Sequence, residues 1–265
     1  MKHIVCFSGG KDSTALVLWA RENLPEFTTV FCDTGWEHPI TYAYVEEINR
    51  TQLDGKLVTL KSDKYADGMR DLVQIKGRVP SAKARFCTDN LKVQPMIAYL
   101  KTINDEVTVY QGIRRDESES RSRMSESCWD DNYDAQVQRP LFNWSAADCF
   151  AMMKRYGVKP NPLYLLGAGR VGCFPCVLIN HRELKALSHN LPEVRERIIE
   201  LERLSGRTFF PPNYIPPRFL TGFDDKSSKA FCRASDVFAY LDATTVDQLP
   251  LLPARSCMSV YNLCE

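Results

Sequence analysis

The chain has 265 residues, of which 44% are hydrophobic and 25% are charged, and its formal net charge is +1. These values are typical of a globular protein with one large domain or a main domain and a smaller one, and they exclude an intrinsically disordered chain. A near-neutral charge gives no overall field that would attract nucleic acid or an anionic membrane. No apolar stretch reaches the roughly 20 residues that span a bilayer, and the N-terminus leads straight into a strand pattern, so we expect a cytoplasmic protein.

The first part of the sequence alternates strand and helix patterns. Apolar runs predict strands at 3–7, 28–32, 56–60 and 106–112, and apolar residues at helical spacing predict helices at 13–23, 40–52 and 89–100. We interpret 113–134 as a long polar loop over the site, followed by a strand at 135–141 and a helix from Ser145 to about residue 156. This order predicts an α/β domain with a doubly wound, Rossmann-like parallel sheet over residues 1–158.

The composition changes after residue 158. The remaining segment is rich in Pro, Gly and Cys, and it contains a helical pattern over 182–205 and a cluster of prolines between 211 and 217. We therefore expect a smaller, cysteine-containing helical part over residues 159–265 that packs on the α/β domain.

The strongest local motif is Ser8-Gly9-Gly10-Lys11-Asp12-Ser13, between the first predicted strand and the first predicted helix. At such a turn the backbone amides and the helix dipole converge on an anion, and glycine permits a close approach. Lys11 would add a positive charge and the two serines hydroxyl donors, while Asp12 would either cap the helix or hold Mg²⁺. The spacing differs from the P-loop NTPase motif G-x-x-x-x-G-K-[ST], so hydrolysis at the γ-phosphate is not implied. An ordinary turn is the alternative.

This loop resembles that of the N-type ATP pyrophosphatases, in the adenine nucleotide α-hydrolase superfamily. The resemblance implies that ATP is cleaved with Mg²⁺ between its α and β phosphates. It also implies a set of residues around the pyrophosphate: Ser8, Gly9, Gly10, Lys11, Asp12 and Ser13. By the same resemblance Asp33, which follows the second predicted strand, would lie near the nucleotide or magnesium; a plain Asp-Thr-Gly turn is the other interpretation.

A run of arginines and acids, Gly112 to Arg121, follows the predicted strand 106–112. Guanidinium groups there suit phosphate or sulfate, and Glu117 could orient a guanidinium or accept a ribose hydroxyl; a solvated charge run is the alternative. The pattern G-x-R-x-x-E-S-x-x-R resembles a signature of the phosphoadenosine phosphosulfate reductase-like family, with Gly112, Arg114, Glu117, Ser118 and Arg121 as the matching residues. The resemblance implies that Gly112, Arg114 and Glu117 bind the nucleotide. It implies catalytic roles for Lys11, Asp12, Arg114 and Arg121.

Ten cysteines are many for a reducing compartment, so we expect some of them to bind metal or do redox work. Cys6, Cys32 and Cys149 lie in apolar patterns and are expected in the core. Arg85-Phe86-Cys87-Thr88 and Arg170-Val171-Gly172-Cys173-Phe174-Pro175-Cys176 resemble two further segments of the same reductase-like family.

The cysteine segments predict a metal site. Cys173 and Cys176 form a C-x-x-C pair and Cys87 is a third ligand of the kind that iron–sulfur clusters use, so we predict a [4Fe–4S] cluster, with zinc and metal-free thiols as alternatives. For the fourth ligand we favour Cys257 over Cys128 and Cys264. In family members that hold a cluster, a cysteine pair can stand where this chain has Cys87 followed by Thr88.

The sequence as a whole predicts an ATP-binding enzyme that forms AMP and pyrophosphate and adenylates an acceptor, for sulfur transfer or nucleic-acid modification. A sulfonucleotide reductase that releases sulfite is one alternative. Such enzymes have a phosphate loop like S-x-G-A-E-D, whereas the loop of this chain contains Lys11. They also have a tail like E-C-G-x-H, whereas this chain ends with Leu263-Cys264-Glu265. A non-catalytic nucleotide-binding subunit is the other. The expected partners are an adenine nucleotide and a nucleic acid or sulfur carrier; a homodimer and a subunit of a larger complex both stay open.

Overall fold

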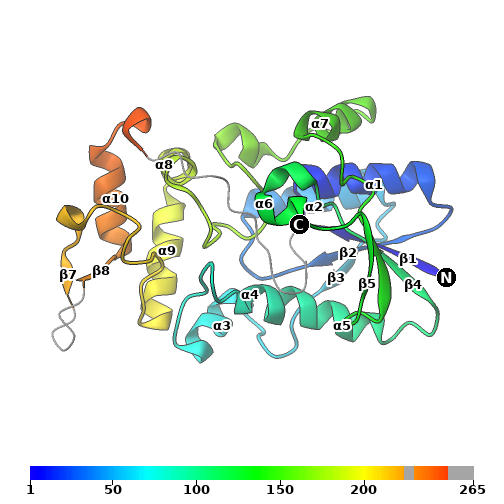
Figure 1. The fold of residues 1–265 in the computed structure, drawn as a ribbon, viewed down its shortest axis with the longest axis horizontal. Coiled ribbons are helices and arrows are strands. Elements are labelled where there is room, and N and C mark those ends of the chain that lie inside the picture. The colour runs from blue at the N-terminus through cyan, green and yellow to red at the C-terminus, as the bar shows by residue number, and fades with distance from the viewer. Residues whose placement is uncertain (224–229, 250–265) are drawn as a thin grey trace.

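The structure is a computed structural model and describes residues 1–223 and 230–249. Its centre is a six-stranded sheet with the order β3-β2-β1-β4-β6-β5 (Figure 1). The strands are β1 (Lys2–Phe7), β2 (Thr28–Cys32), β3 (Val58–Leu60), β4 (Val107–Tyr110), β5 (Ser127–Asp130) and β6 (Ala135–Gln138). All neighbours in this sheet pair in parallel except β5, which runs antiparallel to β6. The predicted Rossmann-like α/β fold is confirmed.

Helices cover both faces of the sheet. The helices in this part of the chain are α1 (Lys11–Asn23), α2 (Pro39–Gln52), α3 (Met69–Lys76), α4 (Phe86–Thr88), α5 (Gln94–Leu100), α6 (Glu119–Ser122) and α7 (Ala146–Arg155), of which α1, α2, α5 and α7 pack on the sheet. Because side chains alternate along a strand, Val5 and Phe7 of β1 pack with α1, α2 and α7, while Ile4 and Cys6 pack with α5 on the other face. Figure 1 shows α1 and α7 on one side of the sheet and α5 on the other.

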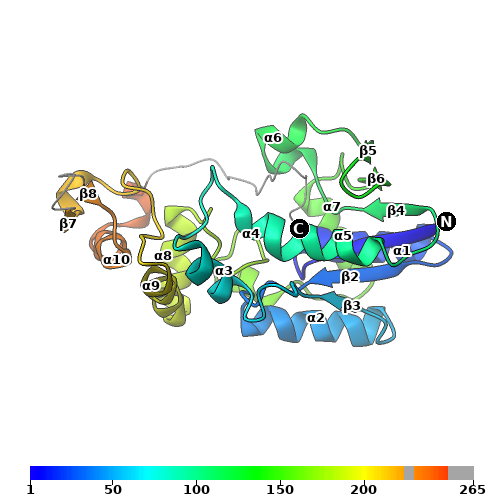
Figure 2. The same cartoon turned by 90° about the horizontal axis from the view of Figure 1, so that it is seen from below.

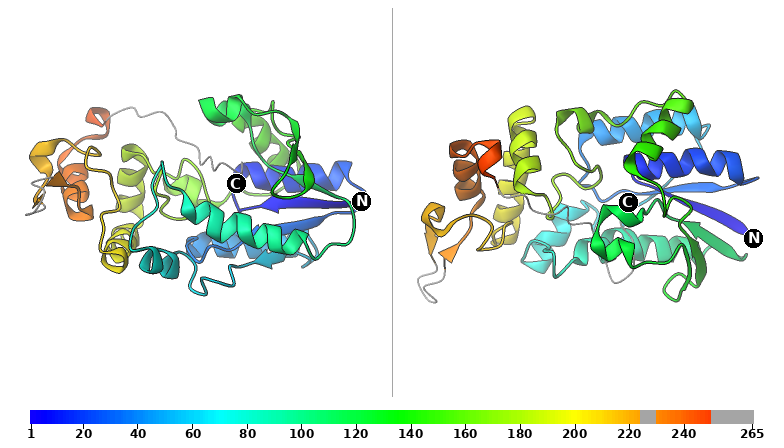
Figure 3. Two further views of the ribbon diagram at one scale, coloured as in Figure 1. Left: turned by 60° about the horizontal axis from the view of Figure 1, so that its bottom comes forward. Right: turned by 45° about the horizontal axis from the view of Figure 1, so that its top comes forward.

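The C-terminal part lies beyond the carboxyl ends of the parallel strands (Figures 1 and 2). It contains α8 (His181–Asn190), α9 (Glu193–Ser205), α10 (Ala234–Ala243), the short pair β7 (Gly222–Phe223) and β8 (Ala230–Phe231), and 3₁₀ turns at Pro162–Leu166, Pro217–Phe219 and Val246–Gln248. Both views in Figure 3 show α8, α9 and α10 together at this end. A third hydrophobic cluster joins these helices to Trp36 and to Met69 of α3. The helical C-terminal part therefore packs on the sheet domain, and the boundary at residue 158 stays a prediction.

The polar stretch 113–134 is more ordered than the sequence indicates. It contains a 3₁₀ turn at Arg115–Glu117, helix α6 and strand β5, so the interpretation as a long loop was wrong over these residues. Strand β5 forms because it pairs with β6 across a turn in which the Asp130 carboxylate accepts hydrogen bonds from the amides of Asn132 and Tyr133. A strand at a sheet edge can expose most of its side chains, which leaves little apolar pattern for sequence analysis to find.

Helix boundaries also differ from the predicted ones. The helix expected at 89–100 begins earlier, with α4, and continues through a π-helical segment, Asp89–Val93, before α5. Helices α3 and α10 were not predicted. None of the described helices is long and apolar enough to cross a membrane.

Candidate functional site

The phosphate-loop motif lies where the strand order of the sheet reverses. Strand β1 has β2 on one side and β4 on the other, so the turn after β1 opens at the crevice where open α/β sheets bind ligands. Gly10 is the N-cap of α1 and provides no side-chain cap, so the alternative in which Asp12 caps the helix was wrong. The turn is closed from within, since the Ser8 amide donates to Ser13 Oγ (3.1 Å) and Ser13 Oγ donates to the Gly10 carbonyl (3.1 Å).

Asp12 is the centre of a buried ion-pair group. Its side chain is fully buried and lies 2.9 Å from Lys11 Nζ and 2.5 Å from Arg114 Nε, while the Cys149 thiol donates to it over 3.4 Å. Burial alone would raise the pKa of Asp12, but the positive charges and hydrogen bonds of Lys11 and Arg114 outweigh it and lower this pKa. Asp12 therefore holds two cations beside the phosphate loop. Both of its oxygens are engaged, and its predicted role at Mg²⁺ stays a prediction.

Gly112 brings the arginine motif into contact with the phosphate loop. A Cβ at this position would lie 3.0 Å from the backbone carbon and oxygen of Asp12 and 3.1 Å from the Ser13 nitrogen, so a side chain here would push the backbone of the phosphate loop away by a few tenths of an ångström. Arg114 is 4% exposed and Arg121 is 1% exposed. The alternative of a solvated charge run is therefore wrong for these two arginines.

Glu117 organises the arginine motif. It accepts a hydrogen bond from the Arg114 amide (3.1 Å) and pairs with the Arg121 guanidinium one helical turn later. The interpretation in which Glu117 orients a guanidinium fits this geometry. The ribose contact and the catalytic roles of Arg114 and Arg121 stay predictions.

Asp33 lies at the carboxyl end of β2, at the same edge as the phosphate loop. Its carboxylate accepts hydrogen bonds from the Tyr42 hydroxyl (2.6 Å) and the Gly35 amide (2.9 Å), and it pairs with Lys61 Nζ (3.0 Å). Burial would raise the pKa of Asp33, but these three partners lower it. Asp33 is therefore an anion at the rim of the site, and its contact with nucleotide or magnesium stays a prediction.

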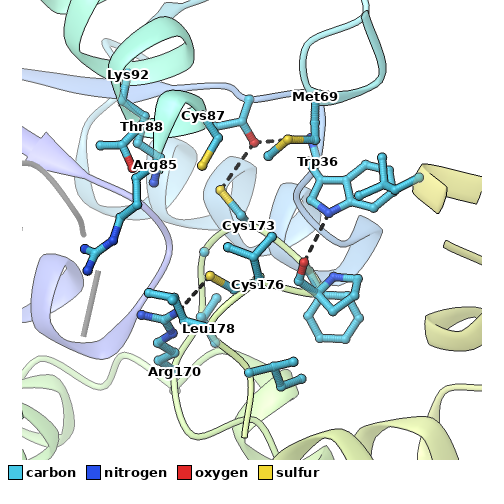
Figure 4. A pocket seen from close by; sticks show the side chains of 18 of the residues that line it. Trp36, Met69, Arg85, Cys87, Thr88, Lys92, Arg170, Cys173, Cys176 and Leu178 are labelled. Atoms are coloured by element: carbon cyan, nitrogen blue, oxygen red, sulfur yellow. Dashed lines mark hydrogen bonds between the residues drawn. The ribbon is translucent and has the colours of Figure 1, made fainter. Parts of the chain in front are cut away.

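The three cysteines of the family-like segments line one pocket. Figure 4 shows Cys87, Cys173 and Cys176 around the same space, with Arg85 and Arg170 at one side of it. Burial, together with negative charge on Cys173 and Cys176, raises the pKa of Cys87 to about 12. The donor atoms fit a thiolate-bound metal in type. Over residues 1–223 and 230–249, however, no group of three or more Cys, His, Asp or Glu side chains is arranged to hold a metal ion.

The fourth cysteine ligand and the metal itself stay predictions. Cys257 and its alternative Cys264 lie outside the described residues. Cys128 lies on β5, where its sulfur accepts a hydrogen bond from Arg139 over 3.4 Å, and it is absent from the pocket lining.

Two residues that sequence analysis missed connect the end of β2 to the cysteine segment. Glu37 is buried beside Cys173 (3.9 Å), accepts a hydrogen bond from the Thr34 hydroxyl (2.6 Å), and has a pKa that burial raises. The Trp36 carbonyl accepts a hydrogen bond from the Phe174 amide (2.7 Å), and its indole donates to the Pro175 carbonyl (3.2 Å). The sequence signal was a Trp-Glu pair directly after Asp-Thr-Gly, in a segment otherwise interpreted as a turn.

Lys92 and Arg85 bring positive charge to the pocket. Burial would lower the pKa of Lys92, but the nearby Cys173 and Glu37 outweigh it and raise this pKa. Burial lowers the pKa of Arg85, which lines the pocket together with Arg170. The pocket thus combines thiols with a group of arginines suited to an anion.

A Rossmann-like sheet with a glycine-rich, cationic turn at its switch point defines a class of nucleotide-binding α/β proteins. Within this class, residues 2–178 match the family model of the phosphoadenosine phosphosulfate reductase domain. The chain therefore belongs to this family and is an enzyme that acts on nucleotides.

Several known proteins are similar to this chain. An uncharacterized 37.8 kDa protein of Escherichia phage 186 is 34% identical, with 99% of this chain and 96% of the relative covered. An adenosine 5'-phosphosulfate reductase of Streptomyces coelicolor is 27% identical over 64% of this chain and 70% of its own length. Among solved structures, a phosphoadenylyl-sulfate reductase from Candida auris, in a phosphate complex, aligns with a TM-score of 0.54 over 66% of this chain and 83% of its own, at 18% identity, which supports the fold.

Proposed function

We propose that this protein is a cytoplasmic enzyme that cleaves ATP between its α and β phosphates and transfers the adenylyl group to an acceptor. The observation that carries the proposal is the buried group of Lys11, Asp12 and Arg114 at the start of α1. Lys11 and Arg114 share the buried Asp12 carboxylate, Arg114 also pairs with the half-exposed Asp116, and both cations lie where the amides of the first helical turn also point. A polyphosphate suits this arrangement.

In the proposed reaction an acceptor oxygen bonds to the α phosphorus, the bond from that phosphorus to the bridging oxygen breaks, and the acceptor loses its proton. The products are the adenylated acceptor and pyrophosphate. Lys11, Arg114 and the loop amides would stabilise the charge that develops on the leaving pyrophosphate. The phosphates themselves would supply most oxygen ligands of Mg²⁺, which commonly binds proteins through only one or two carboxylates. Asp33 and Asp12 are the nearby carboxylates in our proposal.

Cys87, Cys173 and Cys176 would hold a [4Fe–4S] cluster, with Cys257 as the fourth ligand, or zinc in its place. A cluster would supply electron transfer or sulfur chemistry to the acceptor. The neighbouring arginines suit an anionic acceptor, for which we propose a nucleic acid or a sulfur carrier. A homodimer or a larger complex is compatible with this proposal.

The test uses ATP labelled at the α phosphate and separately at the γ phosphate. We expect labelled AMP or adenylated acceptor together with labelled pyrophosphate, and we expect Lys11→Ala to lose both products. Lys101→Ala is the matched control, because Lys101 is an exposed lysine at the end of α5. Tight ATP binding without any cleavage would overturn the proposed reaction.

A sulfonucleotide reductase is the second candidate. It is favoured by the three thiols that line one pocket and by the name of the Streptomyces relative. Sulfite release from adenosine 5'-phosphosulfate or its 3'-phosphorylated form, without pyrophosphate formation from ATP, would establish this function over the proposed one.

A further inference from the structure

The Tyr164 side chain forms a hydrogen bond with a backbone amide of the phosphate loop. It lies in the 3₁₀ turn Pro162–Leu166, and its hydroxyl accepts a hydrogen bond from the Lys11 amide over 2.9 Å. Lys11 Nζ also lies 5.7 Å from the centre of the Tyr164 ring. A residue 153 positions away in the sequence thus contacts both the backbone and the side chain of the loop lysine.

The same turn is anchored to the loop at a second point. Asn161, which is 1% exposed, donates from Nδ2 to the Gly9 carbonyl (3.2 Å), and its Oδ1 accepts from the Leu163 amide (3.0 Å). Asn161 therefore fixes the start of the 3₁₀ turn against the phosphate loop, and Tyr164 is held in register with Lys11.

The contact continues into the cysteine segment. A Cβ on Gly10 would lie 3.2 Å from the Val171 carbonyl and 3.5 Å from the Tyr164 hydroxyl. Val171 directly follows Arg170 and is two residues before Cys173. Tyr164 and the segment that carries the C-x-x-C pair therefore both lie against Gly10 of the phosphate loop.

The Lys11 amide is one of the donors that a phosphate at this helix start would use. The first four amides of a helix have no partner within the helix, which is why such turns bind anions. A tyrosine hydroxyl oxygen has lone pairs that can take the place of a phosphate oxygen on such an amide. In the structure Tyr164 takes that place.

We propose that Tyr164 is a positioning residue whose hydroxyl occupies the Lys11 amide until a phosphate of the nucleotide replaces it, so that nucleotide loading is transmitted to the cysteine segment. The proposal rests on the proposed binding of phosphates at this loop, but not on their cleavage. Replacement is close to an exchange of one hydrogen bond for another. The need to displace the Tyr164 hydroxyl therefore lowers the net affinity of the loop for phosphate.

The test is Tyr164→Phe, which removes the hydroxyl and keeps the ring. Without the hydroxyl the Lys11 amide loses this acceptor in the free protein, and a phosphate provides one, so ATP and pyrophosphate should bind about tenfold more tightly. AMP, which lacks the β and γ phosphates, should bind with unchanged affinity. Tyr156→Phe is the control, because the Tyr156 hydroxyl bonds to Glu22 instead and its removal should change no affinity.

Unchanged or weaker binding of pyrophosphate by Tyr164→Phe would overturn the proposal, and so would the absence of any pyrophosphate binding by the parent. Hydrogen exchange gives a readout in the parent protein itself: pyrophosphate should increase amide exchange over residues 162–176, and unchanged exchange there would also overturn the proposal. These measurements need no turnover. If they succeed while ATP is not cleaved, the proposed reaction fails and the role of Tyr164 stands.

Discussion

Asp12→Asn should destabilise the protein strongly, because it removes the anion that two buried cations share. The exposed fraction is 0% for the Asp12 side chain, 4% for Arg114 and 10% for Lys11. Breaking a buried pair by removing one partner typically costs about 3–5 kcal/mol, because an uncompensated buried charge remains. At about 2.1 cal/mol/K per residue, a chain of this length has an unfolding entropy of roughly 0.6 kcal/mol/K, so Tm should fall by about 5–9 °C.

Thermal unfolding followed by circular dichroism measures this effect, and Asp116→Asn is the matched control. Asp116 pairs with the same Arg114, but its side chain is 49% exposed, so solvent screening should limit its contribution to about 1 kcal/mol or less. Equal Tm values for the two variants would refute the reasoning.

The pH dependence gives a second check. Since the pKa of Asp12 is lowered in the folded state, its stabilisation is full above the ordinary aspartate pKa of about 3.9 and is lost as the pH falls towards the folded value. The Tm difference between the parent and Asp12→Asn should therefore shrink below about pH 4.

Two further predictions concern the loop and the cysteine pocket. Gly112→Ala should weaken ATP binding at least tenfold in a calorimetric titration, because its Cβ would meet the Asp12 backbone at 3.0 Å. Gly172→Ala is the control: its Cβ would meet no atom within 4 Å, so this variant should fold with unchanged stability. Equal ATP affinity in Gly112→Ala and the parent would contradict the close approach. After anaerobic purification, Cys173→Ala should lose bound iron and sulfide and the visible absorbance of an iron–sulfur centre, while Cys149→Ala should keep them; an unchanged spectrum of Cys173→Ala would remove the cluster from the proposal.

The start of the site could be predicted from the sequence because its information is local. Strand β1, the glycine-rich turn and helix α1 are consecutive, and a strand followed by Gly-Gly-Lys and a helical pattern specifies an anion-binding turn without distant partners. The arginine motif was found for the same reason, as it directly follows β4. Their mutual contact could be expected from the parallel order, which brings the carboxyl ends of β1 and β4 to one edge.

The partners of the loop could not be predicted, because they depend on tertiary contacts. Asp12 could cap a helix or bind Mg²⁺ when considered alone, and only the fold brings Arg114, 102 residues away, onto its carboxylate. Tyr164 gave no signal in an irregular segment rich in proline and glycine. Strand β5 was missed because its pairing with β6, rather than an apolar pattern, holds it in place.

The cysteine segment and the phosphate loop are connected through protein contacts, and these constrain any mechanism. Trp36 and Glu37 follow the β2 strand next to β1 and contact Phe174 and Cys173, while Val171 lies against Gly10. A backbone shift at residues 170–176 would therefore disturb the nucleotide edge of the sheet at two places. Packed interfaces of this kind favour discrete arrangements over gradual deformation, so occupation of the phosphate loop and the state of the thiols should depend on each other. Coupling between binding sites is reciprocal. If a ligand on the thiols changes the affinity for the nucleotide by some factor, the nucleotide must change the affinity for that ligand by the same factor.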